Sequence, residues 1–211
     1  PDTIPRLKSS GMQVITLPYP HNWHYQFNFV DGPFKDKRVR QAANYAMDRG
    51  EMVEMLNGLA QEGYATVPPS SPYFGKPVLY KLDQKKATAL LKEAKCYPCE
   101  VTLAISTSGS GQMQPLPMNE FVQQSLKQCY FDVEFDVIEW NTLFTNWRQG
   151  AKHPTANGAH AINVSFAAMD PFFAMVRFVS TKTFPPVSNN WGYYGNEQVD
   201  KLIADARTAF D

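Results

Sequence analysis

The sequence lacks an excess of either charge, because 20 lysines and arginines are matched by 20 aspartates and glutamates. It also contains no block of five like charges. Proteins that bind nucleic acid or an anionic membrane surface usually carry a basic patch or stripe. We therefore expect neither of these partners for this chain.

Long hydrophobic runs are missing as well. The longest are only a few residues, such as residues 172–176, whereas a membrane-spanning helix needs about 20 apolar residues. The chain starts at Pro1 with no initiator methionine and no export signal, and the apolar spacing of residues 196–210 continues to the end without a C-cap. We expect a soluble fragment of a longer protein.

Cysteine is scarce, with Cys96, Cys99 and Cys129 too few for a disulfide-built miniprotein. Cys96 and Cys99 form a C-x-x-C motif, which invites a redox interpretation. In thioredoxin-like enzymes this motif follows a strand and opens a helix, but here a helical pattern precedes it and a strand pattern follows. This favours a structural disulfide or two free thiols. A cysteine-dependent redox enzyme is kept as an alternative.

Strand and helix patterns alternate through most of the chain. Strands are predicted at residues 14–17, 23–30, 101–105, 131–137 and 161–166. Helices are predicted from Asp36, at residues 51–56, after Asp83, after Pro117, and at residues 140–147, 171–179 and 196–210. Residues 67–77, 106–111 and 152–158 are expected to be loops. This order predicts one α/β domain with a mixed sheet flanked by helices and right-handed crossovers.

Motifs for catalysis or metal binding are absent or incomplete. His21 and His24 lie three residues apart, but a metal site needs further ligands, and Pro20 before them favours a turn. Residues 106–111 contain glycine without matching a phosphate-binding motif, and no G-x-S-x-G is present. We therefore predict no metal, no cofactor and no catalytic residue.

Aromatic residues are frequent in the second half of the chain. They are Trp140, Trp147, Phe166, Phe172, Phe173, Trp191, Tyr193 and Tyr194. Most such residues belong to a core. Those near loops can instead line a ligand cleft, where an aromatic ring packs against a solute.

One segment is specific enough to indicate a family. Residues 34–49 resemble the D-x-x-V-R-x-A-x-x-x-A-x-D-R signature of the family 5 extracellular solute-binding proteins, which serve peptide, nickel and related importers. Further segments agree in the same order, namely residues 25–28, Gly58, residues 80–94, residues 121–133, Met169 to Pro171 and residues 189–203. The resemblance spans nearly the whole chain, from Trp23 to Asp211.

This resemblance implies a fold and a function. Residues 1–211 would form a single lobe of the two-lobed type II periplasmic-binding-protein fold, with the other lobe and a returning C-terminal segment absent. The family binds a small solute in the cleft between lobes, closes by a hinge motion and docks on the permease of an ABC importer. It further implies a monomeric periplasmic protein that is not an enzyme. Charges such as Arg40 and Asp48 would fix packing without touching the ligand.

The resemblance also marks candidate ligand-binding residues. They are Ser165, Phe166, Ala167, Asp170 and Trp140. Peptide-binding members carry W-x-x-D-x-x-[DE]-P, whose aspartate receives the amino terminus of the peptide. This chain has Val164 and Ala167 at the tryptophan and aspartate positions, so we expect a solute other than an ordinary peptide. A structural lobe that has lost solute binding is the other alternative.

Two turns depart from the family pattern. The family often has glycine at the positions of Lys95, Cys96 and Tyr130, where a helix C-cap with positive φ is expected. We expect a local rearrangement there, within the same fold.

Overall fold

The computed structural model describes residues 3–17, 19, 21–167 and 170–209. Pro1, Pro18, Pro20, Met169, Phe210 and Asp211, some of which entered the sequence analysis, lie outside the described residues. The helices are α1 (Ile4–Ser9), α2 (Lys37–Tyr45), α3 (Arg49–Met55), α4 (Gln84–Glu93), α5 (Pro115–Lys127), α6 (Trp140–Gln149), α7 (Pro171–Val179) and α8 (Glu197–Ala206). Short 3₁₀ turns are η1 (Pro33–Lys35), η2 (Pro154–Ala156) and η3 (Thr181–Thr183). The strands are β1 (His21–Phe27), β2 (Cys99–Ile105), β3 (Phe131–Val137) and β4 (Ala161–Ala167).

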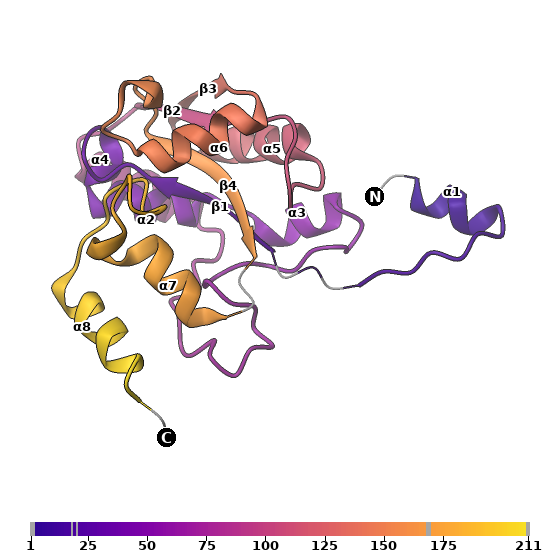
Figure 1. Ribbon diagram of the computed structural model, residues 1–211. Helices are drawn as coiled ribbons and strands as arrows, with labels where there is room; N and C mark the ends of the chain where they lie inside the picture. Colours follow the sequence, from indigo (N-terminus) through magenta and orange to yellow (C-terminus); the bar gives the residue numbers. More distant parts are fainter. Residues whose placement is uncertain (1–2, 18, 20, 168–169, 210–211) are drawn as a thin grey trace.

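The four strands form one mixed sheet in the order β1-β4-β2-β3 (Figure 1). Strand β2 pairs in parallel with both β3 and β4, while β1 pairs antiparallel with β4, His21 opposite Ala167. The predicted α/β class and mixed sheet are confirmed. One consequence of the pairing is that β2, β3 and β4 all end at the same edge, where β1 begins.

Helices cover both faces of the sheet. Helices α2, α4 and α5 pack on one face around a core that includes Leu91, Leu103 and Phe131. Helices α6 and α7 cover the other face, where Trp147 and Val164 are buried and Phe178 packs against them. The protein is therefore a three-layer α/β/α structure in which the two faces of the sheet line two separate cores.

Strand β3 shows why the sequence pattern was informative. Phe131 and Val133 are 3% and 2% exposed, whereas Asp132 and Glu134, which alternate with them, are exposed. Each buried apolar side chain contributes about 1.5–3 kcal/mol of transfer free energy. Shifting the register by one residue would bury the carboxylates, so the alternation fixes which face meets the core.

Acidic and amide side chains define where the helices begin. Asp36 accepts a hydrogen bond from Arg38 N (2.8 Å), and Asp83 accepts one from Lys86 N (2.9 Å). Asp48 caps α3 in the same way through Glu51 N. Asp36 and Asp48 lie inside the family-like segment, and both cap helices there. No helix in the described part of the chain is both long and apolar enough to cross a membrane.

Two predictions near the N-terminus are wrong. Residues 14–17 do not form a strand, because no other strand lies beside them; Ile15 and Leu17 are 73% and 78% exposed. Figure 1 shows α1 and this segment standing away from the body of the protein. His21 and Asn22, where a turn was expected before the predicted strand at residues 23–30, are instead the first residues of β1, because β4 supplies their pairing partner.

The expected rearrangement at the two glycine-like turns is also not seen. Lys95 and Tyr130 take φ values of 58° and 69°, the left-handed conformation that glycine normally supplies. Cys96 N donates to Leu91 O (2.9 Å) and closes the end of α4. Tyr130 likewise precedes β3, with its carbonyl accepting from Cys99 N (3.0 Å). Local hydrogen bonds at the end of α4 therefore accommodate Lys95, and pairing with the start of β2 holds Tyr130.

Cys96 and Cys99 form a disulfide, which decides between the two alternatives left by the sequence. The bond joins the end of α4 to the first residue of β2. Cys129 is a free, buried thiol, and burial raises its pKa to about 11. The predicted order of helix, cysteine pair and strand is confirmed.

We expect replacement of both Cys96 and Cys99 by alanine to lower the free energy of unfolding by about 2 kcal/mol, because the short closed loop constrains the unfolded chain. Urea denaturation with and without reductant measures this. Reductant should destabilise the wild type and the Cys129→Ala control equally, and leave the double variant unchanged. Equal stability of wild type and double variant would show that the bond contributes nothing.

Candidate functional site

The edge at which β2, β3 and β4 end carries a cluster of polar and aromatic residues. We call this the carboxyl edge and define it by His21, Ser110, Gly111, Trp140 and Ser165. They come from four places in the chain: the start of β1, the loop after β2, the start of α6 and the end of β4. In α/β sheets, ligands commonly bind outside the carboxyl ends of parallel strands. The topology thus makes this edge the candidate site.

Ser165 connects three segments at the carboxyl edge. Its hydroxyl donates to the carbonyl oxygen of Ser110, and His21 Nδ1 lies 3.3 Å from its Oγ. Because the Ser165 hydroxyl proton is donated to the Ser110 carbonyl, His21 Nδ1 is the donor in its contact with Ser165 Oγ. The Tyr19 ring stacks on His21 with centroids 4.2 Å apart. Strand β1, strand β4 and the loop after β2 are therefore tied together by one hydroxyl.

Two glycines allow the loop after β2 to approach the strands. Gly111 has φ of +70°, and a Cβ there would lie 2.0 Å from His21 Nδ1 and 2.6 Å from Ser165 Oγ. Gly109 has φ of +130°, and its Cβ would lie 2.5 Å from the Trp140 ring. Both close contact and positive φ therefore require glycine in this loop.

A tryptophan and a glutamine complete the loop's attachment. Trp23 Nε1 donates to Gln112 Oε1 at 3.1 Å, while Gln112 Nε2 is buried without an acceptor among the described residues. His21, Ser110 and Gln112 were all missed as site residues by sequence reasoning. The only signal was the Ser/Gly-rich run at residues 106–111, which looked like a simple turn.

The predicted site residues do not all lie together. Ser165 belongs to the carboxyl edge, as does half-buried Trp140. Phe166 points to the opposite face of the sheet, where it contacts Phe178 with ring centroids 4.5 Å apart. The alternation of side chains along β4 makes this separation unavoidable.

Asp170 has a structural role at the start of α7. Its Oδ1 accepts hydrogen bonds from Phe172 N (2.8 Å) and Phe173 N (3.2 Å). Such a cap satisfies backbone donors at the first turn of a helix. Half-buried Ala167 ends β4 opposite His21, and burial lowers the pKa of His21. The strand end therefore carries a small apolar residue and a histidine that favours its neutral form.

The two histidines of β1 do not converge. His21 faces Ser165, whereas His24 faces the α7 side, where its ring lies 5.8 Å from that of Phe178. Residues three apart on a strand point to opposite faces. His24 Nδ1 lies 3.2 Å from the carbonyl oxygen of Asn22, so this nitrogen makes its hydrogen bond within its own strand.

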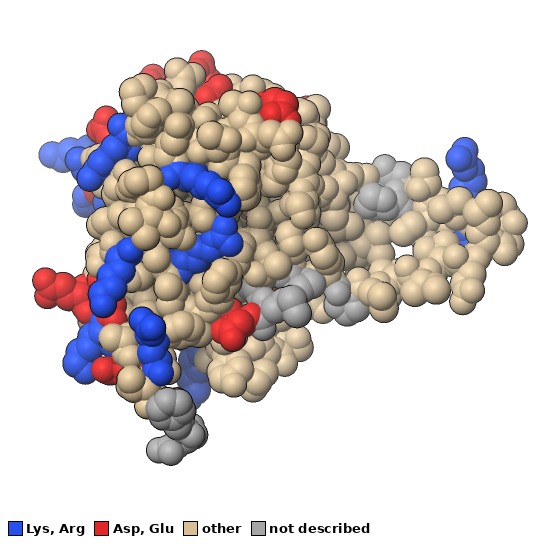
Figure 2. Space-filling view, in the orientation of Figure 1, with Lys and Arg blue, Asp and Glu red and all other residues tan. Residues whose placement is uncertain are grey.

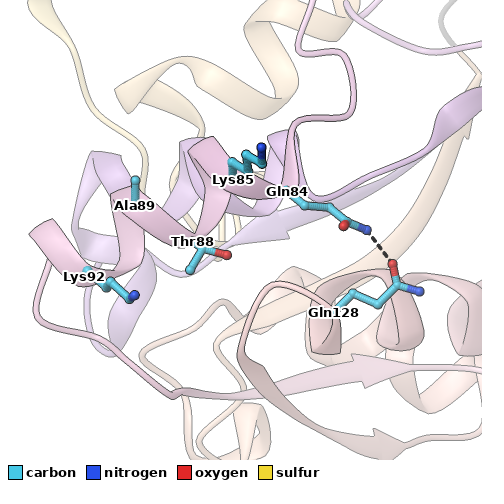
Figure 3. A pocket seen from close by; sticks show the side chains of 6 residues that line it. All are labelled: Gln84, Lys85, Thr88, Ala89, Lys92 and Gln128. Atoms are coloured by element: carbon cyan, nitrogen blue, oxygen red, sulfur yellow. Dashed lines mark hydrogen bonds between the residues drawn. The ribbon is translucent and has the colours of Figure 1, made fainter.

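The disulfide and a shallow surface depression both lie away from the carboxyl edge. Cys99 is the first residue of β2, at the opposite end of that strand. A shallow depression of about 410 Å³ is lined by Gln84, Lys85, Thr88, Ala89, Lys92 and Gln128 (Figure 3). Gln84 Nε2 donates to Gln128 Oε1 across it at 2.6 Å. Gln128 lies between the end of α5 and the start of β3, so the depression is near the amino ends of the strands. It lies on the surface of α4 and is open to solvent.

The comparisons with known proteins agree with this architecture. Residues 1–185 match the model of the family described as Bacterial extracellular solute-binding proteins, family 5 Middle. The glutathione-binding protein GsiB of Escherichia coli K12 is 27% identical over 204 residues, which cover 94% of this chain and 39% of that protein. The chain thus spans about two fifths of the length of this relative.

Solved structures show the same fold at low sequence identity. The murein tripeptide binding protein MppA of Escherichia coli matches with a TM-score of 0.78 and 23% identity, covering 100% of this chain and 41% of that one. NikA from Staphylococcus aureus, in complex with Ni(L-His)2, matches with a TM-score of 0.79 and 17% identity, covering 100% and 43%. DppA from Helicobacter pylori, in complex with the peptide STSA, matches with a TM-score of 0.76 and 19% identity, covering 100% and 44%.

The fold and the carboxyl edge define part of a type II periplasmic-binding-protein structure. This confirms the predicted fold class. The chain belongs to the family 5 bacterial extracellular solute-binding proteins, as the resemblance in residues 34–49 had indicated. Family members named above are binding proteins, and their ligands differ widely.

We expect Gly111→Ala to destabilise the protein by about 1–3 kcal/mol, because the new methyl group meets His21 and Ser165 and the backbone is held at positive φ. Thermal unfolding measures the loss. Gly63→Ala is the matched control, since a Cβ at Gly63 meets nothing within 4 Å. Equal melting temperatures for the two variants would mean that the loop does not dock on the strands as described.

Acid should destabilise the protein through its half-buried histidines. Partial burial lowers the pKa of His24, His21 and His160. A lowered pKa in the folded state means that the unfolded chain binds more protons below the ordinary value of 6.5. Stability is therefore full above about pH 6.5 and falls as the pH drops below it.

The melting temperature measured between pH 7.5 and pH 5 tests this dependence. His24→Gln should flatten the decrease relative to the wild type, whereas His153→Gln, at an exposed position, should not. An unchanged slope in His24→Gln would assign the acid sensitivity to other groups.

Proposed function

We propose that this chain is the ligand-binding lobe of the solute-binding component of a bacterial ABC importer. Membership in the family 5 solute-binding proteins is the observation that carries the proposal. The carboxyl edge supports it, because hydroxyl, imidazole, amide and indole groups from distant segments converge there. A small solute would lie against this edge and be released to the permease for uptake.

The proposal assigns residues 1–211 to one lobe of a longer protein. The relatives that the chain matches are more than twice its length, and it covers 39% of GsiB. The remaining part would form the opposite wall of the cleft. A solute that contacts both walls only when they approach shifts the equilibrium towards the closed form, which the permease recognises.

The setting of this function follows the family. Family members are extracellular, and we place this protein in the periplasm as a monomer that meets its permease at the membrane surface. Balanced charge argues against nucleic acid as a partner; Figure 2 shows basic and acidic side chains both present on the viewed face. Binding requires no cofactor and no catalytic group. The proposal therefore assigns no enzymatic activity.

The residue at the end of β4, Ala167, limits the class of solute that can bind. In the peptide-binding pattern, an aspartate at the position of Ala167 pairs with the ammonium group of the ligand. Here Ala167 lies opposite His21, and Asp170 Oδ1 is engaged by the backbone of α7. A buried ammonium without a carboxylate costs several kcal/mol. We propose a solute that presents a neutral hydrogen-bonding group here.

A thermal-shift screen of the full-length protein tests the function. The panel contains dipeptides, N-acetylated peptides, sugars, opine-like amino-acid conjugates and nickel chelates. Stabilisation by a solute without a free ammonium group supports the proposal. Stabilisation by free dipeptides only would contradict the assigned solute class, and no stabilisation by any solute would favour a structural lobe that does not bind.

We expect Ala167→Asp to strengthen binding of free dipeptides by about tenfold, because it restores a charge partner for the ammonium group. Isothermal titration calorimetry on the full-length protein measures the change. Ala167→Asn has nearly the same shape without the charge and should give no gain. N-acetylated dipeptides should not benefit from either variant, and an equal gain for them would assign the effect to something other than charge.

A further inference from the structure

Arg177, on α7, lies among aromatic rings on the sheet face opposite Ser165. Its guanidinium carbon is 4.9 Å from the ring centroid of Phe166 and 5.5 Å from that of Trp147. Phe173 and Phe178 lie within 5.8 Å of it. Rings on several sides exclude water from much of the side chain, which is half-buried.

No carboxylate neutralises Arg177 within the described part of the chain. The ion pairs there are Arg38 with Asp36 and Lys201 with Asp205. The one hydrogen bond that Arg177 makes to described residues runs from Nε to Asn189 Oδ1, at 2.7 Å. Its two Nη groups, the fork that normally grips an oxyanion, have no acceptor among these residues.

Two other half-buried arginines, Arg40 and Arg49, differ from Arg177 because their guanidinium groups donate to backbone carbonyls. Arg40 donates to the carbonyls of Phe34 and Lys35, at 2.7 and 2.8 Å. Arg49 donates to Gly63 O and Tyr80 O, at 2.9 and 2.8 Å, as well as to Asn44. Each is satisfied by backbone oxygens, as a structural arginine should be. Among the described residues, Arg177 has neither backbone oxygens nor an acid as partner.

The surroundings of Arg177 contain further donors without acceptors. Asn189 is 3% exposed, and its Nδ2 is buried without a partner among the described residues. Its orientation is fixed, because Oδ1 accepts from Arg177. Gln26 contacts Trp147, one of the rings around Arg177: its Oε1 accepts from Trp147 Nε1 at 3.1 Å, and its Nε2 is buried without a partner among the described residues. Buried donors in native structures normally find an acceptor.

A second guanidinium lies nearby. Arg148, on α6, stacks on Phe144 at 4.8 Å, and both burial and the charge of Arg148 lower the pKa of Arg177. Helices α6 and α7 contain no acidic residue. Figure 2 shows basic side chains over the region in which Figure 1 draws these two helices. Two like charges close together are stabilised by an anion between or beside them.

We propose that Arg177, with Asn189 and Arg148 beside it, forms a binding site for a carboxylate. The planar fork of arginine matches a carboxylate through two parallel hydrogen bonds, and the aromatic surroundings strengthen them by excluding water. This site is distinct from the carboxyl edge, because Phe166 and Ser165 face opposite sides of β4. It does not depend on the proposed solute-binding function.

NMR of the arginine Nε–Hε groups tests the site directly on this 211-residue chain. Sodium acetate is titrated at constant ionic strength against sodium chloride. The Arg177 resonance should shift saturably with acetate and not with chloride. Arg177→Gln should weaken acetate binding at least about tenfold, measured on the Arg148 resonance and neighbouring amides. Arg207→Gln, at an exposed position on α8's C-terminal side, should change nothing.

Arg177→Lys is the second variant, in case Arg177→Gln does not fold. It keeps the charge and the aliphatic stem but loses the fork, so binding should weaken while the amide spectrum stays native-like. A shift that is linear in acetate, equal for chloride, or retained in both Arg177 variants would overturn the proposal. None of these readouts uses a solute of the full-length protein, so failure here is distinguishable from failure of the proposed function.

The source of the carboxylate is resolved in the full-length protein. If the solute supplies it, Arg177→Gln should weaken solute binding about tenfold or more. If a carboxylate side chain from the rest of the polypeptide supplies it, the same variant should lower the melting temperature and leave solute affinity unchanged. An unchanged affinity together with an unchanged melting temperature would overturn the site in the full-length protein.

Discussion

The parallel pairing of β2 with both β3 and β4 is the constraint on which the rest of the structure depends. It makes three strands end at one edge, so that the loop after β2, the start of α6 and the end of β4 meet there. Antiparallel β1 adds its first residue, His21, to the same edge. A candidate binding surface thus arises from backbone hydrogen bonding before any side-chain chemistry is considered.

The alternation of side chains along these strands divides the chemistry between two faces. Ser165 and Phe166 are neighbours in the chain, yet one joins the hydrogen-bonded carboxyl edge and the other joins the rings beneath α7. His21 and His24 are separated in the same way. The sheet therefore supports two unlike environments. One is polar and bordered by glycines; the other is aromatic and holds several donors without an acceptor among the described residues.

The arginines illustrate how the fold distributes charge. The signature segment of the family contributes Arg40 and Arg49, which end on backbone carbonyls and hold η1, α2 and the loops around them. They are structural, although they lie in the most recognisable part of the sequence. Arg177 lies outside that segment, and its two Nη groups have no acceptor among the described residues. Family resemblance and functional chemistry are thus located in different parts of the chain.

The sequence by itself determined the α/β class, the position of most helices and strands, and the family. It could do so because caps such as Asp36 and Asp83 are local, and because the period of two in β3 is visible in a single segment. It could not place the start of β1 at His21 or reject a strand at residues 14–17, since a strand is decided by a partner far along the chain. Only the tertiary structure showed that Ser165 contacts Ser110 and Arg177 contacts Asn189, because these contacts join separate segments and no pattern within either segment predicts its partner.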